Sequence, residues 1–305
     1  PCYNEEEALP LTKKELDKKM SSLIEEGLIS ENSKVVLVND GSKDKTWEII
    51  TKIHKENNMY VGINLTRNRG HQNALLAGLM YAKNHADICI SMDADLQDDI
   101  NVMDDMIKKY NAGADVVYGV RSSRKKDTFF KKFTAEAFYK LMNIMGVEVV
   151  FNHADCRLMS KRALEGLSEF KEVNLFLRGI VPQVGYKTDI AYYERSERVA
   201  GESKYPLKKM LAFAIDGITS FSIKPLRMIT SIGFIILILS FVVLIYSIIM
   251  KLICNTVSGW TFIVCSIWLI GGIQTLCLGV IGEYIGKIYK ETKARPRYII
   301  ECVLD

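Results

Sequence analysis

The feature that most constrains the fold is a regular alternation of short apolar runs with amphipathic helical segments. The sequence predicts strands over residues 34–39, 61–65, 88–92 and 115–120, and helices between them over 44–57, 71–84 and 100–111. Strands that alternate with helices of this length are typical of βαβ units. We therefore expect an α/β domain built on a mostly parallel sheet.

Polar side chains follow three of the predicted strands at the point where each strand ends. Asp40, Arg67 and Asp93 each come directly or almost directly after an apolar run. In open α/β sheets the ligand crevice lies beyond the carboxyl ends of the strands. We expect these three side chains to line one edge of the sheet; the alternative, that they are ordinary solvated loop residues, stays open.

The triplet Asp93-Ala94-Asp95 follows the apolar run 88–92. Two carboxylates spaced in this way converge where the chain turns, and they can then bind a hard divalent cation and, through it, a diphosphate. A lone acidic triplet is common on solvated turns, so the motif depends on its context. The loop 38–46 joins a strand to a helix but lacks the Walker A and G-x-G-x-x-G patterns, so the sequence indicates neither a P-loop nor a dinucleotide fold.

Two long stretches without charged residues occupy 228–250 and 252–282. About 20 apolar residues are enough to cross the hydrocarbon layer of a bilayer. The sequence therefore predicts transmembrane helices over 228–250 and 259–282. Lys and Arg residues flank the outer ends of both stretches, which places the N-terminal domain and both termini in the cytoplasm. We expect an integral membrane protein with the lipid bilayer as a partner.

The segment that precedes these stretches has an amphipathic pattern. Apolar residues recur at helical spacing at Leu207, Leu211, Ala214, Ile218 and Phe221. This pattern predicts a helix in the membrane interface, and a helix packed on the domain itself is the alternative.

The predicted organisation begins with a catalytic domain over residues 1–203. An interfacial helix over 204–227, the two spans and a cytoplasmic tail over 283–305 follow it. The polar segment at Pro1 is of a kind that usually follows a strand, so we expect a first strand that the sequence does not contain.

Charge and cysteine content exclude two classes of function. A formal net charge of +4 is too small to indicate nucleic-acid binding, and the basic residues cluster beside the apolar stretches, where anionic lipid is a simpler partner. The 7 cysteines are odd in number and contain no C-x-x-C pair. This usage favours free thiols in a reducing compartment over a disulfide framework or a zinc site.

Seven motifs occur in an order that resembles a known family. They are Pro1–Glu5, Val38–Ser42, Arg67–Gln72, Met92–Asp98, Ala154–Met159, Phe176–Gly179 and Arg198–Tyr205. With the two apolar stretches after them, they resemble the family 2 inverting glycosyltransferases of GT-A fold. Within that family the chain is similar to the polyprenyl-phosphate glycosyltransferases, such as dolichol-phosphate mannose synthase and bactoprenol glucosyltransferase. Cys156 departs from the pattern, because an aromatic residue commonly occupies that position.

The resemblance implies a nucleotide-sugar donor, a UDP-sugar such as UDP-glucose, at the carboxyl ends of the strands. The residues that it assigns to the donor are Pro1, Tyr3, Glu5, Asp40, Arg67, Asp93, Ala94, Asp95 and Gln97. Asp93 and Asp95 would hold Mg²⁺ or Mn²⁺, which neutralises charge on the leaving diphosphate.

The resemblance also assigns an acceptor site. Asp155 matches the catalytic base; a purely structural pair with Arg157 is the alternative. A phosphate monoester with a second pKa of about 6 is already mostly dianionic at neutral pH, so Asp155 can instead orient the acceptor. The candidates for contact with the acceptor phosphate are Arg121, Arg178, Arg198 and Lys204.

The function that follows is the inverting, metal-dependent transfer of one sugar to polyprenyl (undecaprenyl) phosphate. The reaction would take place at the cytoplasmic face of a bacterial plasma membrane and supply a lipid-linked sugar for cell-envelope glycosylation. A homo-oligomer is possible. A processive polysaccharide synthase is one alternative, although Gln183–Tyr186 does not match the Q-x-x-R-W signature of that class. A catalytically silent scaffold that binds sugar nucleotides is another.

Overall fold

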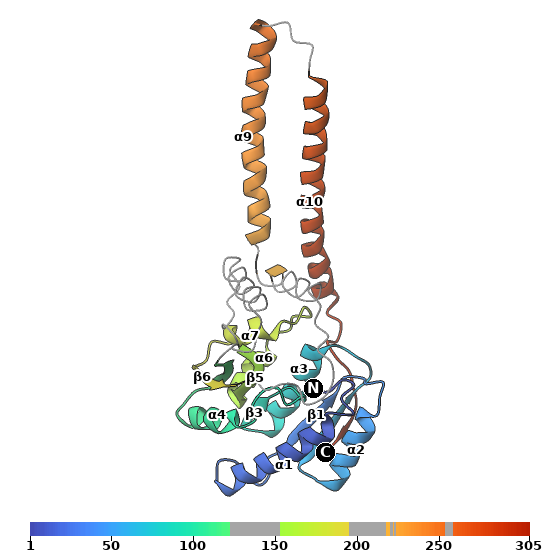
Figure 1. Cartoon of the computed structure of the whole chain (residues 1–305), viewed down its shortest axis with the longest axis vertical. Coiled ribbons are helices and arrows are strands. Elements are labelled where there is room, and N and C mark those ends of the chain that lie inside the picture. Colours follow the sequence, from blue (N-terminus) through green and yellow to red (C-terminus); the bar gives the residue numbers. More distant parts are fainter. Residues whose placement is uncertain (123–152, 195–217, 220–221, 223, 254–258) are drawn as a thin grey trace.

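Two sheets flanked by helices form the α/β body of the molecule, and two long helices project from it (Figure 1). The computed structural model describes residues 1–122, 153–194, 218–219, 222, 224–253 and 259–305. Both ends of the chain lie within the body and not in the projecting helices (Figure 1).

The first sheet has the strand order β1-β2-β7. β1 (Val35–Asn39) and β2 (Tyr60–Leu65) are parallel, and β7 (Ile300–Leu304) pairs with β2 in the antiparallel direction. α2 (Thr46–Glu56) connects β1 to β2 and packs on them, burying Ile50 and Ile53. The apolar spacing of α2 therefore becomes the face that covers the first sheet.

The second sheet has the strand order β3-β5-β4-β6. Its strands are β3 (Ile88–Ser91), β4 (Val116–Arg121), β5 (His153–Ser160) and β6 (Thr188–Tyr193). β5 lies between β3 and β4 and is antiparallel to both, whereas β4 and β6 are parallel. The sequence-based expectation of a mostly parallel sheet is therefore wrong in detail, because later segments of the chain, β5 and β7, enter the two sheets in the reverse direction.

Each strand and helix predicted between residues 34 and 120 is present, with ends within two residues of those predicted. α3 (His71–His85) and α4 (Val102–Asn111) complete this part of the chain. Three further helices are α1 (Leu9–Glu25), α6 (Lys161–Ser168) and α7 (Leu177–Gln183). The sequence predicts only the last of them, as a helix that carries Arg178. α6 and α7 pack on the same face of the second sheet as α3, and this packing positions the site.

The apolar core follows the two faces of the second sheet. On one face Leu79 of α3, Leu164 of α6 and Ile180 of α7 form a buried cluster with β4. On the other face Met106 and Ile107 of α4 pack against Val117 and Leu158. These contacts fix α3 and α7 on the same side of β5, so that the first turns of both helices lie at one end of that strand.

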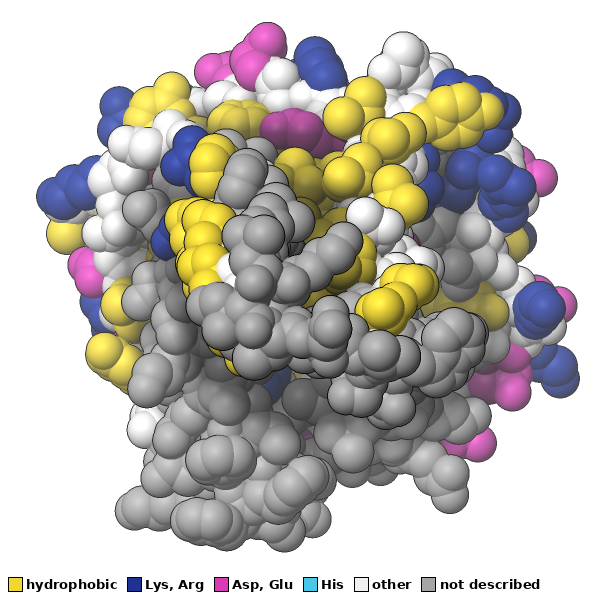
Figure 2. Space-filling model, turned by 90° about the horizontal axis from the view of Figure 1, so that it is seen from above, with side chains coloured by type: hydrophobic (Ala, Val, Ile, Leu, Met, Phe, Trp, Pro, Cys, Tyr) yellow, Lys and Arg dark blue, Asp and Glu magenta, His cyan; other side chains and the backbone are white. Residues whose placement is uncertain are grey.

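The long helices are α9 (Lys224–Ile253) and α10 (Trp260–Lys293), with 30 and 34 residues. They contain the stretches for which transmembrane helices are predicted, and Ile232, Phe234, Ile267 and Leu276 are among their exposed apolar side chains. In a view down these helices, apolar side chains gather near the centre and Lys and Arg side chains lie around the rim (Figure 2).

The membrane prediction does not agree with this structure. Among the described residues no helix, α9 and α10 included, is both long and apolar enough to cross a bilayer. The two transmembrane helices are therefore not confirmed, and the predicted localisation as an integral membrane protein is wrong. The predicted interfacial helix over 204–227 lies mostly outside the described residues.

The segment after α10 returns to the body instead of forming a separate tail. β7 pairs with β2, the amide of Thr66 donates to the carbonyl of Ile299 at 3.1 Å, and the Asn64 side chain donates to Glu301 at 2.6 Å. Earlier in α10, the carboxylate of Glu291 accepts hydrogen bonds from the amides of Val173 and Asn174 at 2.8 and 2.7 Å. α10 is thus fixed to the body at two places.

A buried carboxylate at the start of β4 gives a prediction about acid stability. Asp115 accepts a hydrogen bond from Ser160 at 3.0 Å and two from Arg162, and the bonds from Arg162 lower the pKa of Asp115 in spite of its burial. A carboxyl with a lowered folded-state pKa stabilises the protein above the unfolded pKa of about 3.9, and that stabilisation is lost as pH falls through the folded pKa. We expect Asp115→Asn to lower the free energy of unfolding in urea at pH 7 and to have a much smaller effect at pH 3.

The matched control is Glu169→Gln, at the exposed carboxyl end of α6. It should change the free energy of unfolding little at either pH. If Asp115→Asn lowers the free energy of unfolding equally at both pH values, the ionised Asp115 carboxylate is not the source of the stabilisation.

Candidate active site

The loop after β1 and the loop after β2 are joined by one carboxylate. Asp40 is buried, and its two oxygens accept hydrogen bonds from the amides of Arg69 and Gly70 at 2.7 and 2.9 Å. Burial raises the pKa of Asp40 although these two amides counteract it. The carboxylate therefore fixes the path of the Arg67–Gly70 loop in addition to any contact with a ligand.

Gly41 allows these two loops to meet. Its φ is +61°, and a Cβ at this position would lie 2.5 Å from both the carbonyl carbon of Arg67 and the nitrogen of Asn68. Only glycine tolerates this φ and this approach together. The strand-to-helix turn after β1 is therefore the fixed point against which the Arg67 loop packs.

The segment before α1 lies against the same turn. The amide of Asn4 donates to Ser42 at 3.0 Å, and the amide of Glu5 donates to Thr46 at 2.9 Å. Tyr3 is exposed, and Pro1 is half-buried beside β1. The structure thus gathers Pro1, Tyr3, Glu5, Asp40 and Arg67, all predicted donor-binding residues, around the carboxyl ends of β1 and β2.

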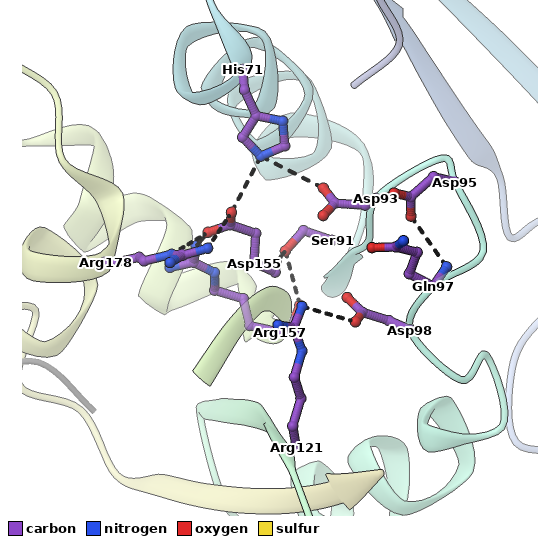
Figure 3. Close-up of polar contacts among 10 residues, drawn as sticks. All are labelled: His71, Ser91, Asp93, Asp95, Gln97, Asp98, Arg121, Asp155, Arg157 and Arg178. Atoms are coloured by element: carbon purple, nitrogen blue, oxygen red, sulfur yellow. Dashed lines mark hydrogen bonds and ion pairs between the residues drawn. The ribbon is translucent and has the colours of Figure 1, made fainter. Parts of the chain in front are cut away.

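The acidic loop after β3 turns as the spacing of its carboxylates requires. Leu96 has a φ of +54°, and the Asp95 carboxylate accepts a hydrogen bond from the amide of Gln97 at 3.1 Å. The carbonyl of Ala94 accepts from the hydroxyl of Thr12 at 2.7 Å, so the helix α1 supports this turn. Asp93 points toward His71, the first residue of α3 (Figure 3).

Asp155, on β5, is the most strongly held carboxylate of the site (Figure 3). Arg178 donates to both of its oxygens, from Nε at 3.1 Å and from Nη2 at 3.0 Å. Arg157 donates to it from Nη2 at 3.2 Å. The Nε2 atom of His71 lies 3.4 Å from Asp155 and 3.6 Å from Asp93. His71 therefore stands between the two carboxylates that the sequence assigned to acceptor and donor.

The same neighbours set opposite pKa shifts on the two carboxyls. Burial works to raise the pKa of Asp155, but His71, Arg178 and Arg157 outweigh it and hold that pKa well below its ordinary value. Burial raises the pKa of Asp93, and nearby Asp155, Asp98 and Asp95 raise it further against the opposing effect of His71. Asp155 is thus an anion at any physiological pH, and Asp93 is a carboxylate that favours an added positive charge.

Arg157 is the unusual cation of the site. Its side chain has no exposed surface, burial lowers its pKa, and its Nε and Nη1 atoms have no hydrogen-bond partner. A buried charge is costly unless it is paired. Asp155 is its counter-charge, so the pair that the sequence analysis gave as a structural alternative is present together with the Arg178 contact.

The structure places two of the four predicted acceptor residues, Arg178 and Arg121. Arg178, in the first turn of α7, contacts Asp155, and the amide of Leu177 donates to Gln72 of α3 at 2.7 Å. Arg121 lies at the end of β4, where its Nη2 is 3.5 Å from Asp98. Arg198 and Lys204 lie outside the described residues.

Sequence reasoning gave little or no role to three side chains that complete this region. The sequence analysis gives Arg157 only as a structural partner, and it assigns neither His71 nor Tyr193 to the site. The hydroxyl of Tyr193 donates to the buried carboxylate of Asp98 at 2.6 Å. The one available signal was the alternation of β5, which places Asp155 and Arg157 on the same face.

The residues present fit a divalent cation that takes part of its ligands from outside the protein. In the part of the chain that the structure describes, no group of three or more His, Cys, Asp or Glu side chains forms a complete metal site. Two features nevertheless suit an added cation. Burial, and to a lesser extent the neighbouring carboxylates, raises the pKa of Asp93, and the Oδ2 atom of Asp98 is buried without a hydrogen-bond partner. A cation that carries its own anionic ligand would stabilise both carboxylates.

This arrangement can hold two anions on either side of a reacting centre. The acidic loop after β3 suits a cation with a diphosphate, and the guanidinium of Arg178, which is partly exposed, suits a phosphate. The carboxylates of Asp93 and Asp155 lie between these positions, linked through His71. Such a site is suited to group transfer between phosphorylated molecules.

Comparison with known proteins agrees with this chemistry. The family model described as "Glycosyl transferase family 2" matches residues 1–168, which include Asp40, Asp93 and Asp155. The chain is 53% identical over 304 residues to "Uncharacterized glycosyltransferase YkoT" of Bacillus subtilis, covering 100% of this chain and 90% of that protein.

Two further relatives carry more specific names. The "Prophage bactoprenol glucosyl transferase homolog" of Escherichia coli is 43% identical over 308 residues, covering 99% of this chain and 97% of the relative. The "Bactoprenol glucosyl transferase" of Shigella phage SfX is 43% identical over 306 residues, with 99% and 97% covered. Since the family model covers more than half of the chain and these relatives match almost all of it, the chain belongs to glycosyl transferase family 2.

Proposed function

We propose that this glycosyltransferase transfers a glucosyl residue from a nucleotide sugar to polyprenyl phosphate, with inversion at the anomeric carbon. The observation that carries the proposal is the 43% identity, over nearly the whole chain, to proteins named bactoprenol glucosyl transferase. The geometry supports it, because a partly exposed arginine and two acidic groups meet where the carboxyl end of β3 lies beside the amino end of β5.

The donor would bind along the loops after β1, β2 and β3. Pro1, Tyr3, Glu5, Asp40 and Arg67 would line the nucleoside, which is the role that the sequence assigns to them. Asp93 and Asp95, with Ala94 and Gln97 in the same turn, would hold Mg²⁺ or Mn²⁺. The cation, when bound, would neutralise charge on the nucleoside diphosphate that leaves.

The acceptor would bind on the opposite side, near α7. Arg178 would contact the polyprenyl phosphate, and Arg121, Arg198 and Lys204 are the further candidates from the sequence. In the inverting step, a phosphate oxygen forms the new bond to the anomeric carbon while the bond from that carbon to the nucleoside diphosphate breaks. The acceptor needs no base at neutral pH because its second pKa is about 6.

Asp155 would orient this reaction instead of accepting a proton. Its lowered pKa makes it a weak base, and its two oxygens are held by Arg178, Arg157 and His71. A fixed anion at this position can direct Arg178 and the sugar hydroxyls, which is a gain in positioning. The same anion would also stabilise positive charge that develops on the sugar ring in the transition state.

The test is a transfer assay with purified protein, detergent-dispersed polyprenyl phosphate and a panel of labelled nucleotide sugars. Label from UDP-glucose should pass into the organic phase on extraction, and alkaline phosphatase pretreatment of the acceptor should prevent it. Transfer from another nucleotide sugar with none from UDP-glucose would refute the donor assignment. Label that is extracted without added acceptor would refute the acceptor assignment.

Metal dependence gives a separate prediction. Removing divalent cations with a chelator should lower transfer at least tenfold, and Mg²⁺ or Mn²⁺ should restore it. Asp95→Asn removes one proposed ligand, so it should raise the cation concentration needed for half-maximal rate by about tenfold or more. Asp99→Asn, in the same acidic run, is the control and should leave that concentration unchanged. Full activity in the chelator would rule out the metal proposal but not the transfer itself.

A further inference from the structure

The side chain of Tyr193 reaches from the apolar core to the acidic loop after β3. Its ring belongs to the buried cluster that contains Met106 of α4 and Leu158 of β5. Its hydroxyl donates to the Oδ1 atom of Asp98 at 2.6 Å, a length typical of a hydrogen bond from a hydroxyl to a carboxylate. Burial raises the pKa of Tyr193 and Asp98 raises it further, so the hydroxyl stays a donor at any physiological pH.

Tyr193 is also the neighbour of Arg121 across two parallel strands. The last residues of β4 and β6 are in register as Arg121 and Tyr193, which places their side chains on the same face of the second sheet. The amide and the hydroxyl of Ser122 both donate to the carbonyl of Tyr193, at 2.9 and 3.1 Å. The backbone therefore fixes the end of β4, which carries Arg121, to Tyr193.

Asp98 lies between these two side chains. It is buried, and the Oδ1 atom that accepts from Tyr193 lies 3.5 Å from the Nη2 atom of Arg121 (Figure 3). Burial works to lower the pKa of Arg121, but Tyr193 and Asp98 raise it against the additional opposing effect of Arg178. Tyr193 and Asp98 thus stabilise the Arg121 cation although the guanidinium of Arg178 lies close enough to repel it.

The hydroxyl of Tyr193 affects how closely Arg121 approaches Asp98. A buried carboxylate is costly unless its oxygens have partners. Tyr193 supplies the short hydrogen bond, while the contact from Arg121 stays long and the Arg121 side chain stays partly exposed. Without the hydroxyl, the carboxylate would draw the guanidinium inward, away from the region that it shares with Arg178.

We propose that Tyr193 is a positioning residue for sugar transfer: its hydroxyl holds Asp98 so that Arg121 stays directed, beside Arg178, at the acceptor phosphate. Two neighbouring guanidinium groups favour an anion between them, and their planar donors match a phosphate. The inference rests on the proposed function, in which that anion is the phosphate of the polyprenyl acceptor. Tyr193 touches no substrate and acts through Arg121.

The test is Tyr193→Phe, which keeps the ring in the core and removes only the hydroxyl. A contact made to the acceptor in both the ground state and the transition state changes KM and not kcat. Tyr193→Phe should therefore raise the KM for polyprenyl phosphate about tenfold and change kcat and the KM for the nucleotide sugar less than about twofold. An acceptor KM equal to that of the wild type would overturn the proposal.

Tyr192→Phe is the matched control. Tyr192 is the preceding residue of β6, so its side chain lies on the opposite face of the strand, and it is 65% exposed. The control should leave kcat and both KM values unchanged. An increase in the acceptor KM equal to that of Tyr193→Phe would overturn the proposal, because the effect would then not depend on the contact with Asp98.

A second background shows whether the hydroxyl acts through Arg121. In Arg121→Gln, Tyr193→Phe should no longer raise the acceptor KM, whereas a purely structural role would add the same factor in both backgrounds and overturn the proposal. Asp98→Asn covers the case in which Tyr193→Phe does not fold. It should raise the acceptor KM when Arg121 is present and not in Arg121→Gln, and equal increases would overturn the proposal.

The wild-type protein separates this inference from the proposed function. A wild type that passes no label into polyprenyl phosphate would refute the proposed function and this inference with it. A wild type that transfers label normally, with a Tyr193→Phe variant that keeps the same acceptor KM, would overturn the inference alone.

Discussion

Asp155→Asn is expected to lower the rate of sugar transfer by about 10²- to 10³-fold, which is the usual effect of removing one preorganised electrostatic group from an active site. The substitution keeps the shape of the side chain but removes its charge. Arg178 then loses the two-point contact that holds its guanidinium in place, and Arg157 loses its counter-charge in a fully buried position. The measurement is kcat and KM for both substrates with purified protein.

The pH dependence of this variant distinguishes orientation from proton transfer. Because the pKa of Asp155 is held well below its ordinary value, the residue stays anionic throughout the assay range. We expect kcat/KM to rise through about pH 6 with ionisation of the acceptor phosphate, in the wild type and in Asp155→Asn alike. Loss of that limb in the variant would show that Asp155 accepts a proton. Asp99→Asn controls for a change of charge near the site, and urea unfolding confirms that each variant is folded in the assay.

Among substitutions that add one methyl group near the site, Gly41→Ala should cause the largest loss in the free energy of unfolding. A left-handed backbone costs a non-glycine residue about 1–2 kcal/mol, and overpacking against a fixed neighbour adds about 1–3 kcal/mol. The neighbour here is backbone, since the new Cβ would lie 2.5 Å from Arg67 and Asn68. That backbone cannot withdraw easily because Asp40 holds the next two amides. Urea unfolding should show a loss of about 2–5 kcal/mol.

Gly27→Ala is the matched control for this prediction. Gly27 has a φ of +68°, close to that of Gly41, but nothing lies within 4 Å of a Cβ built there. It should therefore show only the backbone cost of about 1–2 kcal/mol. Equal losses of unfolding free energy for the two substitutions would mean that the Arg67 loop moves away freely. The close contact between the two loops would then contribute nothing to stability.

Much of the fold between residues 34 and 120 could be predicted because its signals are local. Apolar periodicity and turn residues identify β1, α2, β2, α3, β3, α4 and β4, and the polar residues at the strand ends identify Asp40, Arg67 and Asp93. The motif around Asp155 was found through resemblance to a family. Its role as an anion clamped by two arginines depends on residues that only the fold brings together, since Arg178 lies on a different element.

The features that sequence analysis missed depend on non-local pairing. The direction of β5 between β3 and β4, and the return of the chain after α10 to pair β7 with β2, leave no periodic signal in the segments themselves. Arg157 would be read as a surface residue from its type, yet it has no exposed surface. The predicted spans are not confirmed: both stretches lack charged residues, but no helix in the part of the chain that the structure describes is both long and apolar enough to cross a membrane.

The two-point attachment of α10 has a mechanical consequence for catalysis. Its Glu291 holds the segment that leads into α7 and therefore to Arg178, while the chain after it pairs with β2 and fixes Thr66, next to the Arg67 loop. A force on the projecting helices would consequently be transmitted both to the segment before Arg178 and to the loop that carries Arg67.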